Sequence, residues 1–183
     1  AKIVALASGG DITVNVIKQG REFGLHQTGQ KLASLLTFIT DVHSLSLATM
    51  QGLQFVVPFY WDMDEKTRAF GKRFYDRLGK MPSESQAGVY SGVLHYLKAV
   101  QALGTKDPDK VVAKMRDTPV EDMFSRNGKL LPNGRMIHDM YLVEVKSPAE
   151  SKQPWDYYKM VTTIPADKAF RPLADSVCPL AKR

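Results

Sequence analysis

A cluster of small and polar residues, Ser8-Gly9-Gly10-Asp11, follows the first apolar run of the chain. That run, Ile3 to Ala7, lacks polar alternation and is typical of a strand buried on both faces. Two glycines permit a tight turn, and Asp11 can cap the helix that follows. In open α/β sheets, ligands collect where such turns leave the carboxyl ends of the strands. This turn is therefore the first place to look for a function.

Residues suited to catalysis or metal binding show no comparable arrangement. The four histidines have no spacing typical of metal ligands, and no Ser/His/acid or Cys/His pattern stands out. His138-Asp139 could be a catalytic pair, but a loop pair beside Tyr141 is the better interpretation. A dinucleotide-dependent enzyme is disfavoured because the stretch SGGDIT lacks the G-x-G-x-x-G phosphate fingerprint. We therefore expect a protein that is not an enzyme and that holds neither a cofactor nor a metal.

The strand-helix order of the opening repeats along the first third of the chain. A second strand is predicted over 31–40, a short helix from Thr40 or Asp41, and a third strand over 52–61. Strands separated by helices predict a parallel, doubly wound sheet. Pro58 cannot donate a ladder hydrogen bond, so the third strand should end near it. The first helix is predicted to end at Gly24, with an apolar side formed by Ile12, Val16, Ile17 and Phe23.

Three helices and a hairpin are predicted for the rest of the chain. The helices are expected over 64–79, over 83–103 and from Asp107-Pro108 to about Arg116. Two segments, 138–146 and 154–165, are predicted to pair as strands across a polar loop. One side of the long second helix is predicted to carry Tyr90, Val93, Leu94, Leu97 and Val100.

The positive charge of the chain is dispersed. The 183 residues carry a formal net charge of +6, and the densest basic stretch runs from Lys66 to Lys80. Phe70 and Phe74 lie four residues apart within it, so its basic residues are best interpreted as the solvated side of an amphipathic helix. We therefore expect no nucleic-acid partner. The lone Cys178 is either a free thiol or half of a disulfide whose partner lies outside this chain.

Three stretches match one known family in their order and spacing. They read ALASGGDITVNVIKQGREFGL, QGLQFVVPFYWDMDEKTRAFGKRFYDRLGKMPSESQAGVYSGVLHYLKAVQALGTKDPDKVVAKM and NGKLLPNGRMIHDMYLVEVKSPAESKQPWDYYK. The chain resembles the C-terminal half of the type I periplasmic binding proteins. Among these it is similar to the branched-chain-amino-acid-type substrate-binding proteins of ABC transporters. The resemblance implies an α/β fold of two Rossmann-like lobes that close on a small solute, of which this chain holds only the C-terminal part.

The resemblance also divides the chain between the lobes. Residues 1–60 would belong to lobe two, 61–136 would be a helical segment of lobe one, and 137–183 would hold lobe-two hairpin strands and a tail. The hinge would fall at Phe59-Tyr60-Trp61. The resemblance further implies a periplasmic location, a membrane permease as partner, and cover from the missing N-terminal half or from a dimer mate.

Six residues are candidates for contact with the solute. By resemblance, the tetrad Ser8-Gly9-Gly10-Asp11 lies on the lobe-two wall of the cleft, where backbone amides and short side chains can meet a ligand. Capping remains an equal alternative for Asp11. Tyr90 matches a position where the family often carries an aromatic residue facing the cleft, and its alternative role is a place in the apolar stripe. Phe38 follows the second strand and suggests an apolar or aromatic ligand.

The sequence departs from the amino-acid-binding relatives in one respect. Those relatives commonly place an acidic side chain near the end of the second strand, whereas LLTFITD offers no acid before Asp41. An unpaired buried ammonium costs several kcal/mol, so an amino-acid ligand requires Asp11 or Asp41 as a substitute. The preferred ligand is an aromatic or other hydrophobic carboxylate, followed by a branched-chain amino acid and then an amide or urea-like solute. The alternative function is a ligand-sensing regulatory domain of the same fold.

Overall fold

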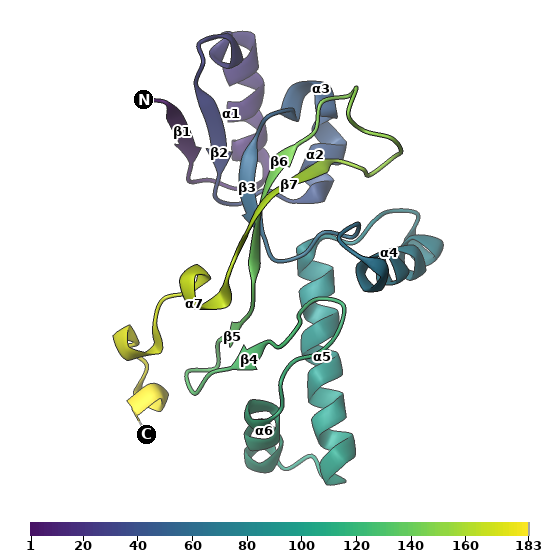
Figure 1. The fold of residues 1–183 in the computed structure, drawn as a ribbon, viewed down its shortest axis with the longest axis vertical. Helices are drawn as coiled ribbons and strands as arrows, with labels where there is room; N and C mark the ends of the chain where they lie inside the picture. The colour runs from purple at the N-terminus through teal and green to yellow at the C-terminus, as the bar shows by residue number, and fades with distance from the viewer. Residues whose placement is uncertain (183) are drawn as a thin grey trace.

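Two bodies make up the computed structural model, which describes residues 1–182 (Figure 1). We call residues 1–57 together with 140–164 the sheet body, and residues 65–137 the helical body. The sheet body holds five strands in the order β1-β2-β3-β6-β7, in which β1, β2 and β3 are parallel while β6 and β7 run antiparallel. Their bounds are β1 (Ile3–Leu6), β2 (Lys31–Ser34), β3 (Gln54–Val57), β6 (Met140–Val145) and β7 (Tyr158–Ile164).

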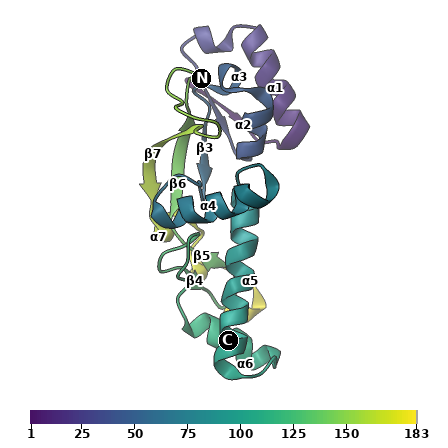
Figure 2. The same cartoon turned by 90° about the vertical axis from the view of Figure 1, so that its right-hand side faces the viewer.

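Helices connect the parallel strands on one side of the sheet (Figure 2). The helix α1 (Gly10–Glu22) and a 3₁₀ turn, η1 (Leu25–Gln27), link β1 to β2, and α2 (Ile39–Leu45) with α3 (Leu47–Met50) links β2 to β3. Right-handed crossovers in the same direction place these helices on the same face. The core between helices and sheet contains Ile17, Ile39, Val42, Met50, Phe55, Val57 and Val143.

The helical body is built from α4 (Glu65–Leu78), α5 (Glu84–Leu103) and α6 (Pro108–Asp117), with a small hairpin of β4 (Lys129–Leu130) and β5 (Met136–Ile137). Asp64 caps α4 by accepting a hydrogen bond of 3.0 Å from the N–H of Thr67. Both long helices end at a glycine in the left-handed region, Gly79 for α4 and Gly104 for α5. These start and stop signals are why the sequence predicted both helices to within one residue at each end.

The chain crosses between the two bodies three times. The first crossing is 58–64 between β3 and α4, the second is 138–139 between β5 and β6, and the third follows β7. The third leads into α7 (Ala166–Ala169), η2 (Leu173–Asp175) and η3 (Pro179–Lys182), which lie beside the helical body (Figure 1). The ring of Phe170 lies 5.3 Å from that of His138, which in turn lies 5.1 Å from Phe124. His138 is therefore a packing residue in a crossing loop.

Two details of the first helix differ from the sequence prediction. Gly9, not Asp11, is the N-cap of α1, and no side chain caps this end, so the capping role of Asp11 was wrong. Of the predicted apolar side only Ile17 is buried, while Phe23 is 85% exposed and Ile12 and Val16 are also exposed. Thr13 is buried instead, and its hydroxyl is satisfied by a hydrogen bond of 2.8 Å with that of Ser8.

The strands are shorter and less buried than predicted. β1 lies at the sheet edge with Ile3 59% exposed, so it is not buried on both faces within this chain. The second strand stops at Ser34 rather than Thr40, because the Ser34 hydroxyl accepts hydrogen bonds from the N–H of Leu36 and the hydroxyl of Thr37. Those local bonds turn the chain out of the sheet. The third strand ends at Val57, next to Pro58 as predicted.

Candidate functional site

The carboxyl ends of β1 and β2 form a wall of small and apolar residues. Gly9 lies against Leu36 so closely that a Cβ atom there would meet the Leu36 Cδ2 at 2.6 Å. Gly10 has φ +58°, a conformation that favours glycine. Ser8, Gly9 and Gly10 thus form the turn between β1 and α1 that the sequence predicted, and their contact with a ligand stays a prediction.

Two leucines on this wall were missed by the sequence prediction, which placed them inside a strand. Leu35 is 72% exposed and Leu36 50% exposed, directly after the end of β2. Large apolar side chains that are this exposed, at the carboxyl end of a sheet, are typical of a binding surface. A signal was available in the sequence, since Ser34 and Thr37 flank the pair and are able to turn the chain.

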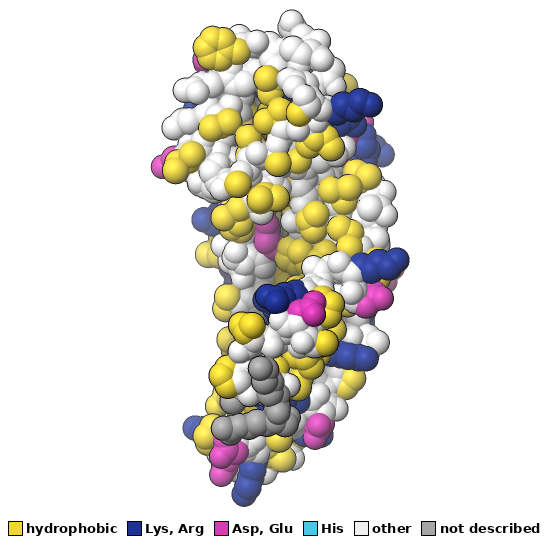
Figure 3. Space-filling view, turned by 90° about the vertical axis from the view of Figure 1, so that its left-hand side faces the viewer, with side chains coloured by type: hydrophobic (Ala, Val, Ile, Leu, Met, Phe, Trp, Pro, Cys, Tyr) yellow, Lys and Arg dark blue, Asp and Glu magenta, His cyan; other side chains and the backbone are white. Residues whose placement is uncertain are grey.

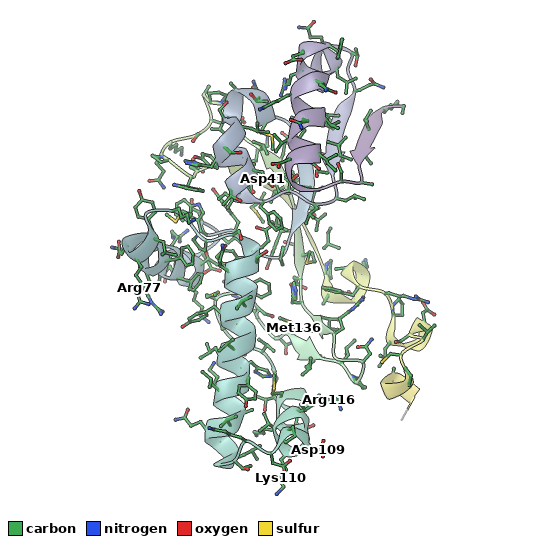
Figure 4. The ribbon with its side chains drawn as sticks, turned by 180° about the vertical axis from the view of Figure 1, so that it is seen from behind. Asp41, Arg77, Asp109, Lys110, Arg116 and Met136 are labelled. Atoms are coloured by element: carbon green, nitrogen blue, oxygen red, sulfur yellow. The ribbon has the colours of Figure 1, made fainter. Side chains whose placement is uncertain are left out.

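Phe38 and Asp41 are joined at the start of α2. Phe38 is half-buried, and its N–H donates to the Asp41 Oδ2 at 2.8 Å. Asp41 is partly buried at the lower margin of the sheet body, above the first turn of α5 (Figure 4). Asp11, in contrast, is exposed, and its carboxylate accepts no recorded hydrogen bond within the described residues. Of the two acids that could substitute for the missing one, the structure places Asp41 at the junction with the helical body.

The first turn of α5 faces the sheet body. Its first residue, Glu84, is partly buried, and burial raises the pKa of its carboxyl to about 7; its own N–H opposes this rise in part, and the charge of Asp41 adds a smaller increase. The N-cap Ser83 accepts a hydrogen bond of 3.2 Å from the N–H of Ser85. Figure 3 shows hydrophobic side chains gathered at mid-height of the molecule, with an acidic side chain in the hollow between the two bodies.

Aromatic side chains fill the first crossing. Phe59, Tyr60 and Trp61 are all buried, at 2%, 3% and 6% exposure. The Tyr60 hydroxyl and the Trp61 indole N–H both donate to the backbone carbonyl of Trp155, at 3.1 and 2.9 Å. Phe59 packs toward the helical body, where its ring centre lies 6.0 Å from that of Phe70 in α4. The predicted hinge residues thus lie where the two bodies meet and contact both of them.

Tyr90 is not brought together with the other candidates. Its ring lies 5.0 Å from that of Phe70, and the Arg73 guanidinium lies 5.9 Å from the ring centre. It lines an apolar groove of ≈ 770 Å³ between α4 and α5, together with Phe74, Val93, Leu94 and Leu97. These contacts favour the alternative that the sequence left open, a place for Tyr90 in the apolar stripe of α5.

A second hollow, of ≈ 480 Å³, lies at the opposite end of the sheet, near Arg21 and Glu144. The Arg21 guanidinium donates to the backbone carbonyls of Thr49 and Gln51, so these donors are already used within the protein. No group of three metal-ligating side chains occurs among residues 1–182. None of the described helices is long and apolar enough to cross a membrane.

Comparisons with known proteins agree with this geometry. Residues 1–153 match the family of periplasmic binding proteins. The chain belongs to this family. A periplasmic ligand-binding protein of a branched-chain amino acid ABC transporter from Burkholderia xenovorans is 48% identical, with a TM-score of 0.92. The alignment covers 99% of this chain and 48% of that one.

Two further structures extend the comparison within the periplasmic binding proteins. One from Burkholderia mallei is 49% identical, with a TM-score of 0.90, over 98% of this chain and 48% of that one. A solute-binding protein of an ABC transporter from Rhodopseudomonas palustris, in complex with 3,4-dihydroxybenzoic acid, is 18% identical, with a TM-score of 0.72, over 90% of this chain and 45% of that one. No curated protein matched. The chain spans about half the length of the structures it matches, and its fold is that of type I periplasmic binding proteins.

Proposed function

We propose that the chain is part of the extracytoplasmic solute-binding component of an ABC uptake transporter. Its solute would be a small carboxylate with a hydrophobic or aromatic body, a branched-chain amino acid included, and its partner a membrane permease. The observation that carries this proposal is the apolar edge at Gly9 and Leu36, which follows the carboxyl ends of β1 and β2. In Figure 1 these strands point toward the helical body. Family membership supports binding without catalysis and a location outside the cytoplasm.

In this proposal the sheet body belongs to one lobe and the helical body to the other. The backbone of Ser8, Gly9 and Gly10 would contact the polar head of the solute, and Leu36 with Phe38 would contact its apolar body. Phe59, Tyr60 and Trp61 would absorb the closure of the lobes, because they contact both bodies. Asp11 is a less suitable ligand residue, since its side chain is exposed.

Two surfaces of the chain would be covered by the rest of the protein. β1 has a hydrogen-bonding edge without a partner strand among the described residues, and the α4–α5 groove exposes Val93 and Leu97, each 53% exposed. Unpaired edges and contiguous apolar grooves of this size are typical of surfaces that another segment covers. We propose that the missing N-terminal half supplies that segment, and that a dimer mate replaces it when the chain is isolated.

Ligand binding to the complete two-lobed protein tests this function. A panel of aromatic acids, aliphatic carboxylates and branched-chain amino acids would be screened by thermal shift and confirmed by calorimetry. At least one member should raise the midpoint of unfolding, because a ligand that binds only the native state stabilises it. Leu36→Glu should abolish that shift by placing a charge on the apolar wall, whereas Val112→Glu, an exposed position on α6 outside the α4–α5 groove, should retain it. Binding that survives Leu36→Glu would show that this edge is not the site.

A further inference from the structure

The loop between β6 and β7, residues 146–157, is held in one shape by its own contacts. Its two ends are joined by the N–H of Lys146, which donates to the carbonyl of Tyr157 at 2.8 Å. The buried Asp156 forms an ion pair with Lys146 through one carboxylate oxygen. Its other oxygen accepts the N–H of Lys152 at 2.9 Å. The β6–β7 loop is therefore a closed unit attached to the sheet body.

One residue of this loop has an unfavourable backbone conformation. Trp155 has φ +70°, in the left-handed region that a bulky side chain rarely adopts. Its ring is 5% exposed and lies 4.0 Å from that of His43 in α2, with the two planes 7° apart. Such a conformation persists only where the surroundings impose it, and such residues cluster at functional sites and switch regions. The stack on His43 and the closed loop together hold Trp155 in place.

The carbonyl of Trp155 is the acceptor to which the first crossing is bound. The Tyr60 hydroxyl and the Trp61 indole N–H both donate to it. The Tyr60 hydroxyl also accepts the N–H of Tyr157 at 3.1 Å. The start of the crossing is therefore hydrogen-bonded to the β6–β7 loop on the sheet-body side.

Trp61 extends this connection to the helical body. It lies so close to Gly71 of α4 that a Cβ atom at position 71 would be 3.2 Å from the Trp61 Cβ and 3.6 Å from the ring atom Cε3. A single side chain thus packs on α4 and donates to the loop of the other body. A continuous set of contacts runs from His43 through Trp155 and Trp61 to Gly71.

We propose that the β6–β7 loop sets the angle between the sheet body and the helical body, with Trp155 as its positioning residue. A change of angle that displaces the first crossing breaks the hydrogen bonds to the Trp155 carbonyl and leaves buried polar groups unpaired. The loop therefore restrains the two bodies to one resting angle. This restraint needs no solute, so the inference stands or falls independently of the proposed function.

Distances between two spin labels in the complete protein, measured without solute, test the restraint. The labels are attached at Lys18 in α1 and Lys110 in α6, both exposed and in different bodies (Figures 1 and 4), through an encoded ketone amino acid that leaves Cys178 untouched. The unaltered protein should give one narrow distance peak. Tyr60→Phe removes the hydroxyl and keeps the ring, and it should raise the population outside this peak about 10-fold.

A second pair of variants tests the positioning of Trp155 from the other side. His43→Ala removes the ring that stacks on Trp155, at an exposed position of α2, and should also raise the population outside the peak. His43→Phe keeps a flat ring there and loses only the hydrogen bond of 2.7 Å to the Tyr157 hydroxyl. It should restore the narrow peak, because the stack rather than this hydrogen bond holds Trp155.

Two controls separate a change of angle from a general loss of stability. Tyr158→Phe removes a hydroxyl from the same aromatic cluster, 4.8 Å from the Tyr60 ring, but this hydroxyl has no hydrogen-bond partner among the described residues. Ile17→Val truncates a buried side chain of α1 and should lower the urea midpoint. Both should leave the distance peak unchanged. An unchanged peak in Tyr60→Phe or His43→Ala would overturn the proposal, as would an equal broadening in either control.

Discussion

Glu84 should make the stability of the folded chain depend on pH. Burial, reinforced by Asp41, raises its pKa from 4.5 to about 7, so the folded state favours the neutral carboxyl. The resulting stability is complete below pH 4.5 and is lost as the pH rises through 7. Glu84→Gln should therefore flatten the decline between about pH 5 and pH 8, which amounts to up to about 3 kcal/mol. Urea unfolding of both proteins across this range measures the effect, and identical pH slopes would contradict it.

Phe38 should select for aromatic solutes. Its half-buried ring stands at the end of the β2 segment, beside the exposed leucines of the wall. Replacing Phe38 with Ala in the complete protein removes ring contacts that contribute roughly 1 kcal/mol beyond the buried area. The affinity for an aromatic ligand should fall about 5-fold more than that for an aliphatic one of similar size. Calorimetric titration of both ligands decides the matter, and an equal loss for the two would exclude a ring contact.

Part of the candidate site could be predicted from the sequence, but its acidic part could not. The turn at Ser8, Gly9 and Gly10 after the first strand was predicted correctly, because glycines after an apolar strand constrain the local backbone. Glu84 carries no such local signal, since a glutamate after Ser83 is an ordinary helix start. Its raised pKa depends on burial where the two bodies pack and, to a smaller extent, on Asp41, which is distant in sequence.

The backbone conformation of the turn into α1 favours glycine at Gly10. Gly10 has φ +58°, so Gly10→Ala should destabilise the chain by about 1 kcal/mol through backbone strain. Gly92, inside α5, has open space where the methyl group of an alanine would lie, with no atom within 4 Å, and Gly92→Ala should stabilise the helix by about 0.5–1 kcal/mol. Thermal unfolding of the two variants should therefore move in opposite directions. Equal shifts would mean that the left-handed conformation of Gly10 is not maintained in solution.

Helix bounds were predicted better than strand bounds, for a physical reason. Caps such as Asp64, Ser83, Gly79 and Gly104 act within one turn, so a single sequence reveals them. The run after β2 is mostly apolar, and its departure from the sheet follows the hydrogen bonds that the Ser34 hydroxyl accepts from Leu36 and Thr37. Exposed apolar residues that follow a strand therefore resemble strand residues in the sequence.

The isolated chain should not remain a monomer. Val93 and Leu97 lie exposed on the α4–α5 groove, which in the complete protein would be covered by the missing half. We expect light scattering to find a dimer, or a co-purifying N-terminal fragment, and Leu97→Lys should shift the dimer toward monomer. Tyr75→Lys, outside the groove lining, is the control and should leave the association unchanged. A compact, soluble monomer of the unaltered chain would contradict this expectation.

Trp61 and Trp155 are the two tryptophans of the chain, and the indole N–H of one donates to the backbone carbonyl of the other. Both are buried, Trp61 in the first crossing and against Gly71 of α4, Trp155 with its ring 4.0 Å from that of His43 in the sheet body. The emission of Trp61 therefore originates where the two bodies join. A change in the angle between the bodies would alter the surroundings of Trp61, so the chain contains an optical probe of its own bending. Stopped-flow fluorescence could then time closure around a solute without an added label.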